Sequence, residues 1–293
     1  MTIDEFPAWV RSGNWKALKQ QLVTGCYQPS PVRRVEIAKP DGGTRQLGIP
    51  TVTDRVIQQA IAQVLTPIFD PDFSEHSFGF RPGRNGQQAV KQVQSIIKEG
   101  RRFAVDVDLS KFFDRVNHDL LMTRLGDKVK DKRLLKLIKR YLRAGFIDNQ
   151  FKGESRVGVP QGGPLSPLLA NIMLDSLDKE LEKRGHKFAR YADDFTILVK
   201  SQRAGERVLR SISQYLQSRL KLVVNTDKSR VVKTNESQFL GFTFKANRIH
   251  WHPKTLLKFK QNVRKLTNRN WGVSMKYQDR KSTRLNSSHR CLS

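Results

Sequence analysis

Hydrophobic and polar positions along the chain alternate between the period of a helix and the period of a strand. Apolar side chains recur at helical spacing between residues 56 and 64, after a Pro-rich extended stretch and a turn at residues 40–43. Two amphipathic helices are expected between residues 117 and 145, the second rich in Lys and Arg and ended by Gly145. The pattern therefore predicts mixed helices and strands joined without a long linker.

A longer helix is predicted from Ser166, a candidate N-cap followed by Pro167, to Gly185. The expected members of its buried stripe are Leu168, Leu169, Ile172, Met173 and Leu177. Two strands around Asp193, a helix over residues 204–220 and short strands up to Phe244 complete the pattern.

Carboxylates interrupt two of the predicted strands. Residues 103–109 alternate with a period of two, so that Asp106 and Asp108 share one strand face. In the run Tyr191-Ala192-Asp193-Asp194, successive side chains of a straight strand would point to opposite faces. A hairpin turn would bring both aspartates to one site, although the default interpretation of this tetrapeptide alone is a plain polar turn.

Asp108 would add a third carboxylate to Asp193 and Asp194 if the two strands were neighbours. Such a cluster repels itself unless cations neutralise it, and oxygen-only ligands suit Mg²⁺. The expected chemistry is in-line phosphoryl transfer with two Mg²⁺ ions, for which Mn²⁺ is a possible substitute. Asp106, on the same strand face, is an alternative to Asp108.

A Gly/Pro loop lies ahead of the long helix, at residues 159–167. Its glycines allow the backbone to approach a ligand closely, and the helix that follows offers free N–H groups at the positive end of its dipole. In isolation the loop is also consistent with an ordinary turn.

Composition indicates the kind of partner. The 293 residues include 54 Lys and Arg against 27 Asp and Glu, a formal net charge of +27, which favours nucleic acid as a partner. Only Cys26 and Cys291 are present, so no disulfide framework or Cys-based zinc site is expected. No apolar run approaches the ~20 residues that span a bilayer, and no signal peptide is recognisable. We therefore expect a cytoplasmic protein that does not bind membranes.

Taken in order, seven segments resemble the reverse transcriptase/maturases encoded by group II introns. They are residues 39–45, 48–50, 77–83, 108–113, 161–167, 191–194 and 239–242. The resemblance implies an α+β, right-hand polymerase with fingers (1–100), a palm (101–244) that holds a helical fingers insertion (115–160), and the start of a thumb or maturase region (245–280). The polar, aperiodic tail at 281–293 is expected to be non-native or disordered.

The resemblance also assigns roles to single residues. Asp108, Asp193 and Asp194 are the implied metal ligands, and Phe113 is the implied gate under the incoming sugar. Lys39 and Arg45 match residues that contact the triphosphate, and Gln161 and Gly162 match the loop that lines the nascent pair. Lys228 matches a proposed proton donor to pyrophosphate. Phe239, Leu240 and Gly241 match the primer grip, although a buried strand would look the same.

The implied function is RNA-directed DNA polymerisation, in which intron RNA is copied into DNA. The expected partners are an intron RNA template, a DNA primer or target, and deoxynucleoside triphosphates, with a maturase role in full-length members. Two alternatives remain: a non-catalytic, intron RNA-binding splicing factor, and an inactive fragment, because the chain looks shortened at both ends beside the family. The sequence predicts no oligomeric state.

Overall fold

The computed structural model describes all residues except 39–42, 149–150, 154–156 and 268–293. Lys39, most of the turn expected at 40–43 and the tail at 281–293 therefore lie outside the described residues. The chain forms two compact units, each built from three stretches: residues 1–75, 109–180 and 211–225 make unit 1, and residues 76–108, 181–210 and 226–293 make unit 2. Each unit is described by itself below.

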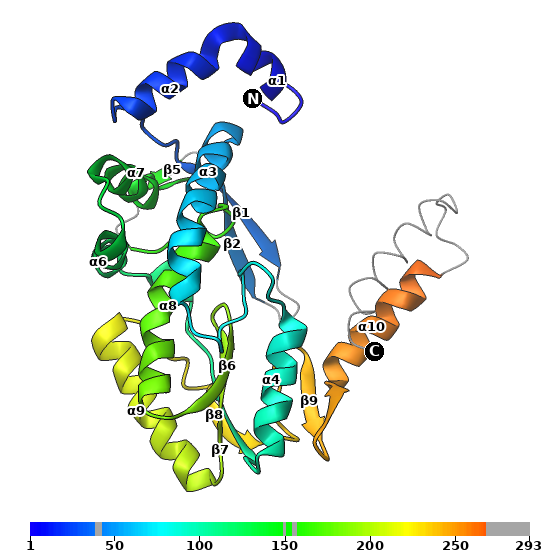
Figure 1. Ribbon diagram of the computed structural model, residues 1–293. Coiled ribbons are helices and arrows are strands. Elements are labelled where there is room, and N and C mark those ends of the chain that lie inside the picture. The colour runs from blue at the N-terminus through cyan, green and yellow to red at the C-terminus, as the bar shows by residue number, and fades with distance from the viewer. Residues whose placement is uncertain (39–42, 149–150, 154–156, 268–293) are drawn as a thin grey trace. The chain divides into compact units, whose positions relative to one another are not determined.

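Unit 1 combines helices with a four-stranded sheet of order β2-β1-β4-β5 (Figure 1). Its strands are β1 (Val32–Ala38), β2 (Thr44–Ile49), β4 (Phe146–Asp148) and β5 (Phe151–Gly153). Its helices are α1 (Phe6–Trp9), η1 (Val10–Asn14), α2 (Trp15–Val23), α3 (Val52–Phe69), η2 (Asp70–Asp72), α5 (Phe112–Arg115), α6 (His118–Lys128) and α7 (Lys132–Arg143). α8 (Ser166–Lys183) and α9 (Gln202–Leu220) each begin in one unit and end in the other.

The helix predicted around residues 56–64 is α3, but the residues that predicted it do not share one buried face. Ile57 and Ile61 are buried, whereas Val64 is 60% exposed. The buried stripe also includes Asp54, which accepts hydrogen bonds from other parts of unit 1 and so turns its side of the helix inward. Val56 lines a separate hollow of about 450 Å³ on unit 1.

The other predicted helices are confirmed. α6 and α7 occupy the region between residues 117 and 145, and Gly145 has φ 73°, a backbone conformation that favours glycine. The expected stripe of α8 is buried throughout. Ser166 is the first residue of α8, and its hydroxyl donates to the Pro160 carbonyl at 2.6 Å. No helix in the described parts of the chain is both long and apolar enough to cross a bilayer.

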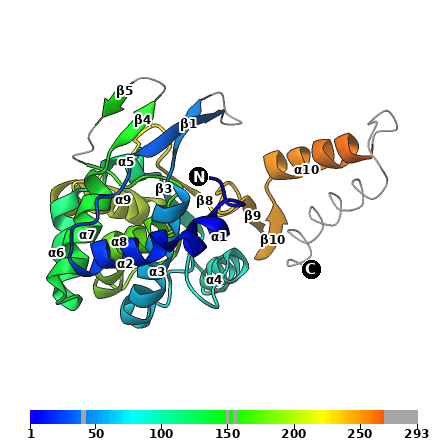
Figure 2. The ribbon, with the colours of Figure 1, turned by 90° about the horizontal axis from the view of Figure 1, so that it is seen from above.

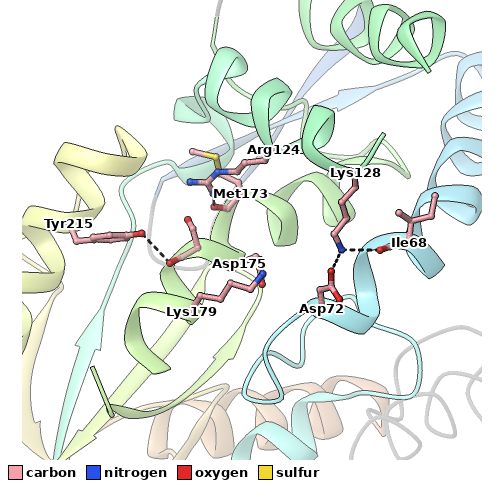
Figure 3. A network of polar contacts seen from close by, with 9 residues as sticks. Ile68, Asp72, Arg124, Lys128, Met173, Asp175, Lys179 and Tyr215 are labelled. Atoms are coloured by element: carbon pink, nitrogen blue, oxygen red, sulfur yellow. Dashed lines mark hydrogen bonds and ion pairs between the residues drawn. The ribbon is translucent and has the colours of Figure 1, made fainter. Parts of the chain in front are cut away.

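Polar contacts join α6 to its neighbours in unit 1 (Figure 3). Lys128, at the end of α6, forms an ion pair with Asp72 and donates to the Ile68 carbonyl at 3.0 Å. Arg124 donates to the carbonyl of Met173 in α8. These contacts attach α6 to the end of α3 and to the middle of α8.

Unit 2 is built on an antiparallel sheet of order β6-β7-β3-β8, with β6 (Lys187–Tyr191), β7 (Asp194–Val199), β3 (Phe103–Val107) and β8 (Arg230–Lys233). α4 (Gly86–Lys98) lies along β6 (Figure 1). A hairpin of β9 (Phe242–Lys245) and β10 (Arg248–Trp251) leads into α10 (Pro253–Leu266) (Figure 2).

The core of unit 2 covers only part of one sheet face. Ala104, Ala189 and Leu198 lie on that face and pack in one buried cluster with residues of α4 and with Phe239 and Phe244. On the opposite face, a Cβ at Gly205 of α9 would lie 2.5 Å from the Val231 side chain, so the helix backbone rests directly on the sheet. The end of the first face, beyond Ala104, carries the polar side chains described next.

Candidate active site

The pairing of β3 with its two neighbours places charged side chains in rows across the sheet. Asp106 lies opposite Thr196 of β7 and Arg230 of β8. Continued by one pair beyond Val107 and Phe195, the register with β7 sets Asp108 opposite Asp194. Lys228, two residues before β8, lines the same pocket from the β8 side of β3. The two carboxylates predicted to meet, Asp108 and Asp194, are therefore brought together, with a lysine on the far side of Asp108.

These rows line a hollow of about 250 Å³ at the polar end of the sheet face. Its lining residues are Asp106, Val107, Asp108, Asp194, Lys228, Arg230, Gln238, Leu240 and Gly241. All belong to unit 2. The hollow presents three carboxylates and two cationic side chains to one small volume.

Asp193 and Asp194 lie at a two-residue hairpin turn, as predicted. Tyr191 pairs with Asp194, which leaves Ala192 and Asp193 as the turn, and Ala192 has φ 59°. Asp193 is half-buried and does not line the hollow, but its charge acts on Asp194. The turn is thus what lets two successive carboxylates influence one site.

The carboxylates crowd one another. The side chain of Asp194 keeps solvent-exposed surface inside the hollow, yet the surrounding protein, followed by the charges of Asp106, Asp193 and Asp108, raises its pKa from 3.8 to about 7. The Leu240 N–H opposes this shift by donating to the Asp194 carboxylate. The excess of negative charge is a property of the folded site that a bound cation would relieve.

Asp106 differs from Asp108 in its partners. Its Oδ1 accepts hydrogen bonds at 2.9 Å from both Thr196 Oγ1 and Ser237 Oγ, two buried hydroxyls. Burial raises the pKa of Asp106, and these hydrogen bonds counteract part of the rise. By contrast, Asp108 bonds to Ser229 through its backbone: the Asp108 N–H donates to Ser229 Oγ at 3.0 Å. Asp106 is therefore held by the protein, which favours Asp108 as the carboxylate that faces a ligand.

In the described residues, no group of three or more His, Cys, Asp or Glu side chains is arranged to hold a metal ion. The donor set itself fits a hard divalent cation, because Asp108 and Asp194 offer only oxygen atoms and are adjacent across the sheet. Such a cation can be bound by one or two carboxylates that share it with substrate phosphates.

The residues expected at the primer grip form a tight turn and not a buried strand. The backbones of Phe239 and Phe242 exchange two hydrogen bonds of 2.9 Å, with Leu240 and Gly241 between them at φ 49° and 84°. Gly241 also accepts from the His252 N–H at 2.9 Å, so this turn joins the Asp194 carboxylate to the start of α10.

Phe113, Gln161 and Gly162 come together in unit 1. The Phe113 carbonyl accepts from the Val159 N–H at 2.6 Å, and the Gln161 carbonyl accepts from the Gly48 N–H at 2.7 Å. Gly162 has φ 120°, and a Cβ there would lie 2.9 Å from the Gly48 carbonyl oxygen. The loop is thus bonded to the Phe113 segment and to the end of β2. Arg45 is exposed on β2.

Sequence reasoning gave no role to several residues around the carboxylates. Thr196 and Ser237 hold Asp106, and Arg230 and Gln238 line the hollow. Arg190, in the strand that enters the hairpin, is wholly buried. A charged residue within the apolar run of β6 was a usable signal, because a buried guanidinium requires partners.

One prediction follows from the raised pKa of Asp194. In the metal-free protein, the folded state keeps this proton between pH 4 and pH 7, where the unfolded chain has released it. The free energy of unfolding should therefore fall as pH rises through that window and level off above pH 7. Urea unfolding with a chelator at pH 5 and pH 7.5 should show a smaller fall for Asp194→Asn than for the unaltered protein. Other titrating groups contribute equally in both proteins. An equal fall in unfolding free energy would therefore contradict the raised pKa of Asp194.

The comparisons with known proteins agree with this geometry. A family model described as reverse transcriptase (RNA-dependent DNA polymerase) matches residues 37–244. Protein YkfC of Escherichia coli (strain K12) is 34% identical over 270 residues, which cover 79% of this chain and 70% of that protein. Group II intron-encoded protein LtrA of Lactococcus lactis subsp. cremoris is 30% identical over 299 residues, 80% of this chain and 50% of LtrA.

A solved telomerase from Candida albicans superposes with a TM-score of 0.55 at 13% identity, over 89% of this chain and 53% of that one. This likeness confirms the predicted α+β polymerase fold. The chain spans about half the length of LtrA and of the telomerase. The match over residues 37–244 includes every described residue of the carboxylate rows, and it confirms the family that the motifs predicted. The chain belongs to the reverse transcriptase (RNA-dependent DNA polymerase) family.

Proposed function

We propose that this chain is an RNA-directed DNA polymerase that copies the RNA of a group II intron. The observation that carries the proposal is the row Asp194–Asp108–Lys228, which lines an open hollow at the end of a sheet in a chain of this family. The expected partners are an intron RNA template, a DNA primer or target, and deoxynucleoside triphosphates. The division into fingers, palm and thumb stays part of this proposal.

The carboxylates would hold the metal ion that the reaction requires. Asp108 and Asp194, with Asp193 beside them, would hold Mg²⁺ through one or two carboxylates and the substrate phosphates. When bound, Mg²⁺ stabilises the attacking and leaving oxygens of an in-line displacement. The Leu240 N–H donates to the Asp194 carboxylate and orients it, and the Oδ1 of Asp106 is already engaged by the hydroxyls of Thr196 and Ser237.

The cations beside the carboxylates would act on the triphosphate. Lys228 lies next to Asp108 in the same hollow, where its ammonium can neutralise and protonate the departing pyrophosphate. Phe113 would exclude a 2′-hydroxyl, Gln161 and Gly162 would line the nascent pair, and Arg45 would contact the triphosphate together with Lys39. The turn at Phe239–Gly241 would bear on the primer strand.

Primer extension tests the proposal. With Mg²⁺ and deoxynucleoside triphosphates, the chain should extend a DNA primer on an RNA template, and Asp193→Ala should not, because that change removes a carboxylate next to Asp194. A circular dichroism melt of both proteins controls for folding. Primer extension by a folded Asp193→Ala variant would refute the proposed mechanism.

A second candidate is a non-catalytic splicing factor that binds intron RNA. The observation that favours it is α7, which has no acidic residue between Lys132 and Arg143. The basic stripe of α7 consists of Lys132, Lys136, Lys139 and Arg143. This candidate predicts that splicing assistance persists in Asp193→Ala. Loss of splicing in that variant with RNA binding intact would count against it.

The basic stripe should contribute to RNA binding under either function. Its members recur at intervals of four, three and four residues and so share one helix face, which points away from the buried Ile138 and Tyr141. Replacing all four residues of the stripe by Gln should weaken the binding of single-stranded RNA. The slope of the logarithm of the RNA association constant against the logarithm of salt concentration should become shallower by about 3, at ~0.7 per phosphate contact.

A matched control removes four charges from another helix. Arg203, Arg207, Arg210 and Arg219 of α9 are exposed, and this helix also carries Glu206. Replacing all four of these arginines by Gln should alter the salt slope less than the change in α7 does. Fluorescence anisotropy across a salt series measures both variants, and equal slopes would show that only net charge matters.

A further inference from the structure

The hairpin turn that carries Asp193 and Asp194 is fixed from inside the protein by Arg190. Arg190 is the largest fully buried side chain among the described residues, with 0% exposure. Its Nη1 donates to the Ala192 carbonyl at 2.9 Å, so the guanidinium reaches forward to the residue that makes the turn. Burial of a guanidinium is costly unless it is well bonded, so loss of this contact would be strongly unfavourable.

A second segment supports the same turn from outside the hairpin. The Arg190 N–H donates to the His76 carbonyl at 2.9 Å, and the Arg190 carbonyl accepts from the Phe78 N–H at 2.8 Å. Residues 76–78 thus pair with β6 next to the turn. Arg81, also buried, donates through Nη1 to the Ser77 carbonyl at 2.9 Å and holds the segment in place.

Gly79 brings this segment into direct contact with the turn backbone. A Cβ at Gly79 would lie 2.3 Å from the Ala192 N and 2.9 Å from the Tyr191 carbonyl carbon. No side chain fits in that space without moving the turn. Ala192 itself has φ 59°, which costs energy for a residue other than glycine and needs surrounding contacts to persist.

We propose that Gly79 and Arg190 form a turn clamp that positions Asp193 and Asp194 for catalysis. Neither residue lines the hollow, so both are positioning residues and act through the Ala192 backbone. A shift at Ala192 passes directly to the two aspartates that follow it in the chain. This inference rests on the proposed polymerase function for the reaction that it affects.

The test compares two glycines beside the same turn. Gly79→Ala forces the turn backbone to move, whereas a Cβ at Gly86 would meet the Leu240 side chain at 3.4 Å and Tyr191 at 3.8 Å, which are ordinary contacts. Gly79→Ala should lower kcat for primer extension by about 10- to 100-fold, the scale expected for a misplacement of ~1 Å. It should also raise the half-saturating Mg²⁺ concentration. The Kd for primer–template should stay within about twofold, and Gly86→Ala should match the unaltered protein in all three quantities.

Arg190→Lys provides an independent test, because it keeps the charge and loses the fixed fork of the guanidinium. It should lower kcat in the same way without weakening primer–template binding. Hydrogen exchange of the metal-free, unaltered chain adds a readout that requires no activity: the amides of the turn should exchange slowly, and faster in either variant.

The outcomes separate this inference from the function on which it rests. Absence of extension by the unaltered chain refutes the proposed function, and the exchange measurement then still tests the clamp. If Gly79→Ala or Arg190→Lys is folded and keeps the kcat and Mg²⁺ dependence of the unaltered protein, the clamp is refuted. If neither variant folds, rapid exchange of the turn amides in the unaltered chain refutes it, and slow exchange supports it.

Discussion

Asp108→Asn should lower the rate of nucleotide incorporation by about 1,000-fold, the upper end of what removal of one electrostatic group costs an enzyme. Asparagine keeps the shape of the side chain and removes its charge, in the row where Asp108 lies between Asp194 and Lys228. The loss should appear in single-turnover extension of a labelled DNA primer on an RNA template, with deoxynucleoside triphosphate in excess.

Asp106→Asn is the matched control, because it makes the same change two residues away on the same strand face. The Asn oxygen can still accept from Thr196 and Ser237, so the fold of the site should be kept. The rate should fall by less than about tenfold, well below the cost of removing a group that acts on the reacting atoms. If Asp106→Asn lowered the rate of incorporation more than Asp108→Asn does, Asp106 and not Asp108 would be the carboxylate that acts on the substrate.

Asp108→Asn should also change the metal-free protein. Its charge is one of those that raise the pKa of Asp194, so its removal should bring that pKa down toward the usual range of a carboxyl. The fall in unfolding free energy between pH 5 and pH 7.5 should then be smaller than in the unaltered protein. A catalytic loss without this change would indicate that Asp108 lies farther from Asp194 than the registers imply.

The strands and the hairpin of the site were predictable because their signals are local. The alternation at residues 103–109 fixes which side chains share a face, and a hairpin turn supplies the departure from straight strand geometry that Asp193 and Asp194 need to serve one site. The structure has both features, in β3 and in the turn between β6 and β7. The register between β3 and β7 was not predictable, because pairing of distant strands depends on contacts that no sequence period records.

Two further features could not be predicted from the sequence pattern. The turn of residues 239–242 resembles a buried strand in composition, since Phe239 and Phe242 are apolar, and only the positive φ angles of Leu240 and Gly241 distinguish it. The buried face of α3 includes a carboxylate, Asp54, because partners from distant segments satisfy it. A period-based analysis places a charged residue on the outside unless those partners are known.

Asp54→Ala should have the largest effect on stability, because Asp54 connects three segments of unit 1. Its Oδ1 accepts from the hydroxyls of Tyr27 at 2.7 Å and Tyr141 at 3.1 Å, and its Oδ2 accepts from Thr51 Oγ1 at 2.6 Å. All of this lies in the interior: Asp54 is 1% exposed, and both tyrosines are buried. The carboxylate thereby joins α3 to α7 and to the segment before β1.

Alanine would leave two buried tyrosine hydroxyls without their acceptor, and each orphaned group costs about 1–3 kcal/mol. We therefore expect the free energy of unfolding in urea to fall by about 2–6 kcal/mol, the sum of two such losses. Asp54→Asn is the control: its Oδ1 can still accept from both tyrosines, so this variant should lose clearly less stability.

The pKa of Tyr27 and of Tyr141, which burial and Asp54 raise, should fall in Asp54→Ala, as a spectrophotometric titration of the folded protein would show. Equal stability of Asp54→Ala and the unaltered chain would mean that the tyrosines find other acceptors, and that α7 is attached to α3 by its apolar contacts alone.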